Sequence, residues 1–381
     1  MQRHVCWIIG LVGLSSLGLG CARTDGPAGS EIVIGEFGSL SGSEATFGVS
    51  TKEGIDLAAS EINAAGGVLG KRIVVKVEND ESLEDRVAAA VQKLINYHNA
   101  VVVIGEVASG RSMVGGPICE NAGVPMVTPS STNPKVTERK KWVFRVCWTD
   151  DFQGEAMARF AYETLGARKS AVFTAINQAY SQGLAEYYEK TFEDLGGNVV
   201  ATESYQGGKD RDFKAQLTNI KSMAPDVLFI PGYYTDVGAI ATQARQVGIS
   251  VPLLGGDGWE AEELFTQAKD VIEGSYYSTH YSSDEERPEV SNFVTAYKAK
   301  FSKTPDAMSA LGYDAMKVVA DAIRRAGSVD QEAIRAALEG TKEFPGVTGS
   351  ITIDENHNAR KPLVVQQLKG GKPTFVKSVQ M

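Results

Sequence analysis

Short apolar runs recur along the chain and alternate with segments of helical period. The runs lie at 32–34, 73–75, 101–104, 125–127, 171–173, 227–230 and 252–254. Because they are continuous rather than alternating, they are typical of strands that are covered on both faces in a parallel sheet. Between them, apolar residues recur at helical spacing over 54–62, 87–95, 155–165, 184–195, 213–223 and 237–247. Strands and helices in this order predict a doubly wound α/β fold.

One order of elements occurs twice, once in each half of the chain. In each half, an apolar strand (101–104, then 227–230) is followed by a glycine turn, a helix and a second strand. The second strand begins after Gly-Val-Pro in the first half and after Gly-Ile-Ser-Val-Pro in the second. A chain of 381 residues is also long for a single core. These features predict two similar lobes. Since open parallel sheets bind ligands beyond the carboxyl ends of their strands, two facing lobes would share one cleft.

The N-terminus has the pattern of an export signal. Arg3 precedes an uncharged stretch over 5–20, which has the length of a signal-peptide core and is short for a membrane span. Residues 21–30 form a polar tether, and folded sequence begins at Glu31. We therefore expect the mature protein in the periplasm or the cell envelope. A short N-terminal anchor helix is the alternative.

The four cysteines fall into two groups. Residues 17–21, Leu-Gly-Leu-Gly-Cys, resemble a bacterial lipobox, which would make Cys21 a lipid-modified N-terminus. Gly18 stands where a lipobox favours Leu, so simple cleavage without a lipid anchor is the alternative. Cys119 and Cys147 lie in the body of the chain, where export would permit a disulfide. Two buried free thiols are the other interpretation of this pair.

Composition and charge exclude several classes of protein. Apolar residues make up 43% and charged residues 22% of the chain, which is ordinary globular composition. The formal net charge of −9 argues against nucleic acid and anionic lipid as partners. The sequence lacks the glycine, serine and histidine motifs of nucleotide-binding, esterase and metalloprotease sites. Its four His residues are scattered, with His280 isolated, so we expect no metal, no cofactor and no enzyme.

Polar residues follow two neighbouring predicted strands of the first half. Ser109 comes after the strand at 101–104 and leads into a helix. It would either cap that helix or help bind a carboxylate at the positive end of the helix dipole. Ser130, Ser131 and Thr132 follow the next strand in a segment rich in hydroxyls and prolines, which is also typical of an ordinary turn.

Asp257 is the sharpest candidate of the second half. It lies between two glycines at the end of a buried strand and close to Trp259, where the chain would approach a ligand closely. Its carboxylate would be the counter-charge of an ammonium group. The alternative role is a cap for the helix predicted at 261–267. Tyr233 and Tyr234 follow the preceding strand and would face the same cleft.

Five segments resemble the branched-chain amino-acid (Leu/Ile/Val) binding proteins of ABC importers, which are type I periplasmic binding proteins. The segments follow the family's order over nearly the whole mature chain. They are GSLSG at 38–42, EINAAGGVLGK at 61–71, TPSST at 128–132, PGYYTDVG at 231–238 and GGDGW at 255–259. The resemblance implies two doubly wound lobes joined by a hinge that the chain crosses three times.

The resemblance also implies how an amino acid would be held. The ligand carboxylate would bind Ser109 and the hydroxyl and N–H of Thr132. The ligand ammonium would bind the carbonyl of Ser130, the hydroxyl of Thr132 and the carboxylate of Asp257, and Ser131 belongs to the same turn. The side-chain pocket would have an aromatic wall, which consists of Phe47, Tyr180, Tyr233 and Trp259.

In proteins of this kind the first lobe would comprise 31–149 plus 279–357, and the second 150–278 plus 358–381. Hinge closure around the ligand would precede delivery to a separate permease and its ATPase subunits, and we expect a monomer. An amide or urea receptor, or a sensory ligand-binding protein, is the alternative on the same fold.

Overall fold

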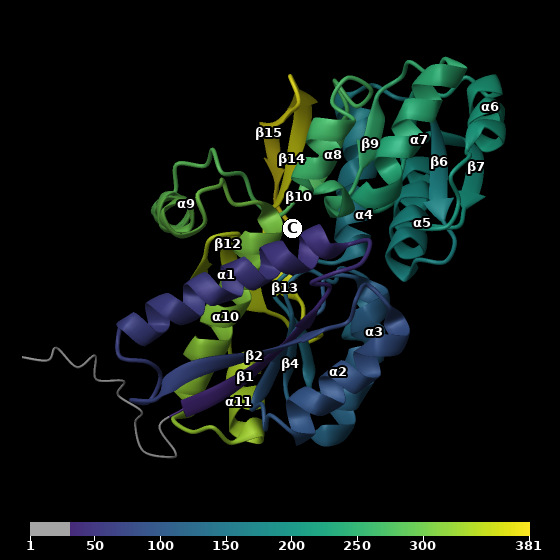
Figure 1. Ribbon diagram of the computed structural model, residues 1–381. Helices are drawn as coiled ribbons and strands as arrows, with labels where there is room; N and C mark the ends of the chain where they lie inside the picture. Colours follow the sequence, from purple (N-terminus) through teal and green to yellow (C-terminus); the bar gives the residue numbers. More distant parts are fainter. Residues whose placement is uncertain (1–30) are drawn as a thin grey trace, which may run out of the picture.

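Two β-sheets with helices on both faces organise the protein, as the computed structural model in Figure 1 shows. The structure describes residues 31–381. The signal peptide, the tether and the lipidation of Cys21 that the sequence predicts lie outside these residues. The mixed α/β architecture confirms the predicted fold class.

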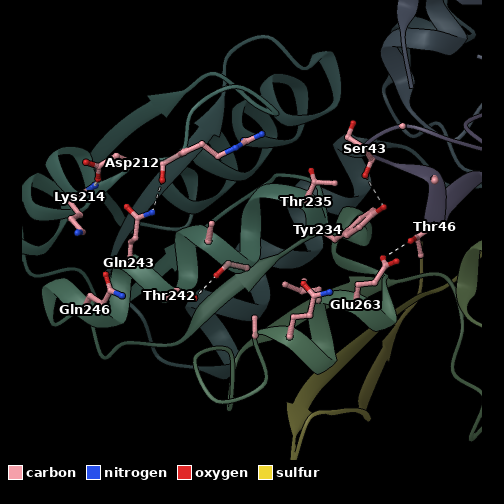
Figure 2. Close-up of a pocket in the computed structure, with 18 residues that line it drawn as sticks. Ser43, Thr46, Asp212, Lys214, Tyr234, Thr235, Thr242, Gln243, Gln246 and Glu263 are labelled. Carbon is pink, nitrogen blue, oxygen red and sulfur yellow. Dashed lines mark hydrogen bonds between the residues drawn. The ribbon is translucent and has the colours of Figure 1, made fainter. Parts of the chain in front are cut away.

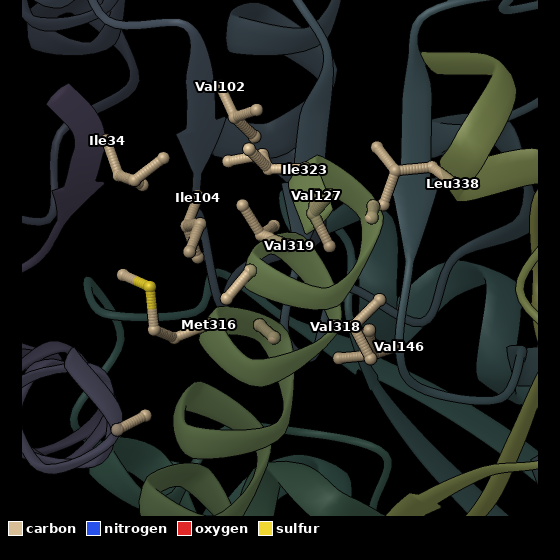
Figure 3. Packing of buried hydrophobic residues seen from close by; sticks show 14 of the residues in the cluster. Ile34, Val102, Ile104, Val127, Val146, Met316, Val318, Val319, Ile323 and Leu338 are labelled. Atoms are coloured by element: carbon tan, nitrogen blue, oxygen red, sulfur yellow. The ribbon is translucent and has the colours of Figure 1, made fainter. Parts of the chain in front are cut away.

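The first sheet is entirely parallel and has the strand order β2-β1-β3-β4-β5. Its strands are β1 (Glu31–Gly38), β2 (Arg72–Asn79), β3 (Val102–Ile104), β4 (Met126–Thr128) and β5 (Val143–Arg145). One face is covered by α1 (Ala45–Ala64), α10 (Ala307–Ala326) and α11 (Gln331–Glu339), and the other by α2 (Glu84–Asn96) and α3 (Ser109–Ala122). Figure 3 shows Ile34, Val102 and Ile104 of the sheet packed against Met316, Val319 and Ile323 of α10.

The second sheet has the strand order β15-β14-β10-β9-β8-β6-β7. Five strands are parallel: β6 (Lys169–Ala175), β7 (Asn198–Tyr205), β8 (Val227–Phe229), β9 (Leu253–Gly255) and β10 (Tyr276–Thr279). The C-terminal hairpin of β14 (Leu363–Lys369) and β15 (Lys372–Val379) joins this sheet antiparallel, so the sheet is mixed rather than purely parallel.

Helices cover both faces of the second sheet. They are α4 (Asp150–Arg159, continued by a π-helical turn at Phe160–Thr164), α5 (Ala179–Asp194), α6 (Lys214–Ser222), α7 (Tyr234–Val247) and α8 (Glu262–Gln267). In β6, Val172 packs toward α4 and α5, whereas Ala171 and Phe173 pack toward α6 and α7. Burial on both faces explains why the predicted strands are continuous apolar runs.

The remaining elements lie beside the first sheet. A small antiparallel sheet contains β11 (Phe344–Gly346), β12 (Gly349–Ile353) and β13 (Ala359–Arg360), and α9 (Pro288–Phe301) packs near α1. Short 3₁₀ turns occupy Pro134–Val136 and Asp257–Trp259. The chain passes between the two sheets after β5, after β10 and after β13.

The element order that occurs twice in the sequence has a local physical cause. Helix α3 is capped at its C-terminus by Gly123 with φ of 64°, and α7 by Gly248 with φ of 89°. Both values are left-handed, a conformation that glycine adopts without steric strain. The turn that follows returns the chain to the sheet as β4 in one half and β9 in the other.

Two local predictions are settled by the fold. Helix α3 begins at Ser109 and its cap position is Ala108, so Ser109 is the first helical residue and is not the N-cap. Cys119 and Cys147 are both buried and free, each in a different apolar cluster of the first sheet. They act as small core residues and form no disulfide.

Candidate functional site

The loops that leave the carboxyl ends of the strands meet between the two sheets. From the first sheet come Ser109 after β3 and the turn 130–132 after β4, and from the second come Tyr233 after β8 and Asp257 after β9. All of these residues are buried. One apolar cluster joins residues of both halves, including Phe47, Val107, Ala108, Trp148, Tyr180, Tyr233 and Met308. The structure therefore brings the polar candidates together at an enclosed interface.

Asp257 is held in place by side chains from three other elements. Its Oδ1 accepts a hydrogen bond from the hydroxyl of Tyr180 at 2.9 Å, and its Oδ2 lies 3.0 Å from Nε2 of His280. Its backbone N–H donates to Oε1 of Gln153 at 2.9 Å. The following helix α8 has Ala261 at its cap position, so Asp257 is not a helix cap. A carboxylate that is buried and fixed in this way is a preorganised partner for a cation.

Three aromatic rings line this region. Tyr180 and Tyr233 are stacked with their centroids 5.1 Å apart and their planes 5° from parallel. Phe47, from the first turn of α1, meets Tyr233 edge to face at 5.8 Å. The rings come from both halves of the protein and form a continuous apolar wall.

Trp259 lies apart from these rings. Its indole belongs to the cluster on the other face of the second sheet, where its Nε1–H donates to the carbonyl of Ile230 at 3.0 Å. A Cβ on Gly255 would lie only 2.1 Å from the indole Cε2, so the ring packs directly on this glycine. The contacts of Trp259 are those of a core residue.

The hydroxyls of the turn after β4 differ in what they contact. Oγ of Ser131 lies 2.7 Å from Oγ of Ser112 and donates to the carbonyls of Glu106 and Val107, so it holds the turn to the loop after β3. Oγ of Ser130 is buried and has no hydrogen-bond partner among residues 31–381. An unpaired buried hydroxyl is unfavourable unless a ligand or water satisfies it.

Two further contacts fix the first half of the site. Oγ of Ser109 accepts the backbone N–H of Asn133 at 3.2 Å, which joins the loops after β3 and β4. The fully buried guanidinium of Arg145 donates to the carbonyl of Ser131 at 2.6 Å and to that of Asn133 at 2.9 Å. The turn that carries Ser130 and Thr132 is therefore tied by hydrogen bonds to both α3 and β5.

Several residues that surround Asp257 could not be predicted from local sequence patterns. His280 follows β10 and stacks on Trp148 at 3.8 Å, so it is part of the site and not isolated as expected. Burial lowers the pKa of His280 to about 4, against an opposing hydrogen bond to Asp257. The neutral imidazole donates from Nε2 to Asp257. Gln153 and Asp150, in the first turns of α4, complete the surroundings of this carboxylate.

A second buried charge cluster lies at the edge of the first sheet. Arg111 of α3 is 2.7 Å from Glu44 and 3.1 Å from Glu106, and 3.8 Å from Asp80. Burial and the neighbouring Glu106 raise the pKa of Asp80 to about 7. The hydroxyl of Ser39 donates to Asp80 at 2.8 Å. This cluster holds α1, α3 and the ends of β1 and β2 together beside the aromatic wall.

A polar cavity of about 760 Å³ lies at the rim between the two halves. Figure 2 shows Tyr234 turned toward Ser43 and Glu263 turned toward Thr46 across this rim. The hydroxyl of Tyr234 donates to the carbonyl of Ser43 at 3.1 Å, and Thr46 donates to the carboxylate of Glu263. The cavity does not include the buried polar candidates, which lie deeper.

Within residues 31–381, no group of His, Cys, Asp or Glu side chains is arranged to hold a metal ion. The same part of the chain contains no helix that is both long enough and apolar enough to cross a membrane.

A pair of α/β halves that enclose preorganised polar groups and an aromatic wall defines a receptor for a small solute. The chain belongs to the periplasmic binding protein family, whose model matches residues 31–372. This membership confirms the family that the five sequence segments resemble.

Two proteins of known structure and one further relative match most of this chain. The structure of a leucine-binding protein, LivK, from Thermotoga maritima is 40% identical, with a TM-score of 0.88, over 92% of this chain and 99% of that one. LivJ from Streptococcus pneumoniae is a branched-chain amino-acid transporter substrate-binding protein whose structure was solved with isoleucine. It is 33% identical, with a TM-score of 0.87, over 92% of this chain and 100% of that one. The Leu/Ile/Val-binding protein BraC3 of Rhizobium johnstonii is 31% identical over 86% of this chain and 89% of its own.

Proposed function

We propose that this protein captures an aliphatic amino acid between its two halves and delivers it to an ABC permease with its ATPase subunits. The observation that carries the proposal is the buried carboxylate of Asp257, which is held by Tyr180 and His280. Hydrogen bonds through Gln153 and Asp150 link Asp257 to Thr132 in the hydroxyl-bearing turn after β4. Zwitterionic ligands need one anionic and several hydrogen-bonding partners in such an enclosed site. The names of the similar proteins support a branched-chain side chain and do not favour an amide or urea ligand.

In this proposal the polar groups divide by charge. Ser109, at the first turn of α3, and Thr132 bind the ligand carboxylate, where free N–H groups and the helix dipole add attraction. Asp257, the carbonyl of Ser130 and the hydroxyl of Thr132 bind the ammonium. Ser131 shapes the turn through its contacts with Ser112 and the loop after β3 rather than contacting the ligand.

The apolar wall would enclose the ligand side chain. Phe47 belongs to the first half, and Tyr180 and Tyr233 to the second, so a ligand that contacts all three favours the closed arrangement. We assign Trp259 a packing role in the second sheet and not a place in the pocket.

Closure would follow from the path of the chain. We propose lobes of 31–149 plus 279–357 and of 150–278 plus 358–381, which move about the three crossings between the sheets. We further propose a monomer without catalytic activity, exported to the periplasm or cell envelope, with Cys21 as a lipid anchor.

Thermal unfolding with candidate ligands tests the function. A ligand at about 100 times its Kd adds about 2.7 kcal/mol to the free energy of unfolding, so Leu, Ile or Val should raise the melting temperature by several degrees. Urea and acetamide should not. A rise with urea or acetamide alone would overturn the amino-acid assignment. Recovery of the ligand unchanged after incubation tests the absence of catalysis.

A further inference from the structure

Asp150 is a second buried carboxylate at the site. It is the first residue of α4, its backbone N–H donates to the carbonyl of Thr132 at 2.9 Å, and its Oδ1 accepts from Nε2 of Gln153 at 3.1 Å. Its Oδ2 is buried without a hydrogen-bond partner among residues 31–381. Gln153 in turn accepts the backbone N–H of Asp257 at 2.9 Å. One glutamine therefore bridges the two acids.

The surroundings of Asp150 contain more negative than positive charge. The titratable or charged groups that face it come from β5, the segment after β5, α5 and the turn after β9, and they are Arg145, Cys147, Tyr180, Tyr187 and Asp257. Burial raises the pKa of the thiol and of both phenols, so these three are neutral.

Arg145 is the cation of this set. Its guanidinium donates to the carbonyls of Ser131, Asn133 and Pro134 and to Oγ1 of Thr137, and it makes no ion pair with Asp150 among the described residues. Two buried carboxylates therefore share one guanidinium that is already committed to the turn after β4. The buried Lys361 also acts on His280 and Cys147, but its ammonium donates to Thr348 and is balanced by Asp314. One more positive charge would balance the site, and either a proton or an ammonium group can supply it.

We propose that Asp150 is a second anionic group that serves the ligand ammonium through the hydroxyl of Thr132, and that amino-acid capture displaces the proton that Asp150 carries in the empty site. This inference rests on the proposed function. Burial first, and then the neighbouring Asp257, raise the pKa of Asp150 well above its ordinary value, while the hydroxyl of Thr132, the charge of Arg145 and the amide of Gln153 oppose the rise. The raised pKa and the unpaired Oδ2 are both consistent with a bound proton.

Proton release gives ligand affinity a definite dependence on pH. The ammonium favours the ionised form of Asp150, so the bound state holds one proton fewer than the empty state. Affinity therefore rises with pH in the range where Asp150 is protonated without ligand and ionised with it. By linkage, release of one proton corresponds to about a tenfold gain in affinity per pH unit.

Calorimetric titration with leucine tests the inference directly. Titrations at a series of pH values between about 6 and 8, in phosphate and in imidazole, whose ionisation heats differ, give the number of protons released. Over this range, leucine is a zwitterion and releases none itself. We expect the unmodified protein to release a proton on binding leucine, up to about one per leucine, and Asp150→Asn to release none and to bind with an affinity independent of pH. Asp151→Asn, an exposed neighbour in the same helical turn, is the matched control and should behave like the unmodified protein.

Each outcome decides between the hypotheses. If the unmodified protein binds leucine with equal heats in both buffers, or if Asp150→Asn releases the same proton count, the inference is wrong and the proposed function stands. If the unmodified protein binds no aliphatic amino acid, the proposed function itself fails. Should Asp150→Asn not fold, Asp150→Ser keeps a polar residue at the start of α4 and removes the carboxyl group.

Discussion

The hydroxyl of Tyr180 lies 2.9 Å from Oδ1 of Asp257 and 3.1 Å from the backbone N of Gly258. It donates to the carboxylate and accepts from the amide, so it fixes both the acid and the turn that carries it. The ring of the same residue stacks on Tyr233. One side chain thus belongs to the polar and to the apolar part of the candidate site.

Tyr180→Phe should weaken leucine binding about five- to tenfold. The stacked ring remains, but Asp257 loses a donor and the N–H of Gly258 loses its acceptor, at about 1 kcal/mol for a hydrogen bond of this kind. Calorimetric titration measures the change. Tyr162→Phe, half-buried and outside the site, should leave the Kd unchanged. A Kd within twofold of the unmodified protein for Tyr180→Phe would contradict the positioning role.

Asp257→Asn should weaken leucine binding about 10- to 100-fold with the fold intact. The amide can still accept from Tyr180, but it removes the charge that pairs with the ammonium, and hydrogen bonds to charged groups contribute about 1.5–3 kcal/mol. The Kd from titration and the circular dichroism spectrum together measure this. Asp270→Asn, exposed and beyond α8, is the control. Near-normal affinity in Asp257→Asn would exclude it as the ammonium partner.

The sequence predicts the position of Asp257 but not that of its partner His280. A buried strand followed by glycines and an acid is a local pattern. The approach of His280 instead depends on β10 pairing with β9, in which Tyr277 lies opposite Gly255. Strand β10 has the sequence Tyr-Tyr-Ser-Thr, which has no apolar run to mark it as a strand. The contact is therefore a product of tertiary structure.

The same reasoning explains the other differences between prediction and structure. Strand β15 has mostly exposed residues, so this strand of the antiparallel hairpin left no apolar pattern in the sequence, although β14 begins with the buried run Leu-Val-Val. Ser130 and Ser131 are adjacent and chemically identical, and only their contacts distinguish the unpaired hydroxyl from the one tied to Ser112. The aromatic wall joins Phe47 to Tyr233 across 186 positions of sequence, a separation at which local patterns carry no signal.

The free energy of unfolding should fall as pH decreases from about 6.5 to about 4 through His280. Burial lowers its pKa in the folded state to about 4, below the ordinary value of 6.5. Protonation therefore favours the unfolded chain: the contribution is fully present above about pH 6.5 and is lost as pH falls toward 4. A pKa shift of this size corresponds to about 3 kcal/mol in the free energy of unfolding.

Urea unfolding at pH 7 and at pH 4.5 measures this dependence. The free energy of unfolding should fall between pH 7 and pH 4.5 in both proteins. The fall should be about 2 kcal/mol smaller in His280→Asn than in the unmodified protein. His98→Asn, at the end of α2 and away from the site, should retain the full difference. Equal differences in all three proteins would show that the pKa of His280 is the same in the folded and the unfolded chain.

Gly255→Ala should destabilise the protein by about 1–3 kcal/mol and leave the order of preference for amino acids unchanged. The new Cβ would lie 2.1 Å from the indole of Trp259, which must then move within a packed core. Thermal unfolding without ligand measures the loss. Gly238→Ala in α7 is the control, because its Cβ would meet its nearest neighbour at 3.5 Å and alanine favours the helix. A changed ligand preference in Gly255→Ala would instead place Trp259 in the pocket.

Tyr234→Phe and Thr46→Val should each shift the protein from the closed toward the open arrangement. Their hydroxyls bond Ser43 and Glu263 across the rim in Figure 2, and each bond contributes about 0.5–1.5 kcal/mol. Because closure and binding are coupled, leucine affinity should fall about two- to tenfold while the buried polar groups stay unchanged. Small-angle scattering without ligand should show a larger radius of gyration than in the unmodified protein.

The rim bonds lie outside the enclosed site, so their loss should shorten the lifetime of the complex more than it slows association. Ligand release measured by stopped flow should therefore be faster in both variants, with association rates within about twofold. Tyr97→Phe, on a side chain that is 74% exposed, is the control. If release were unchanged while affinity fell, the two hydroxyls would act on ligand entry, and the closed state would depend on the buried contacts alone.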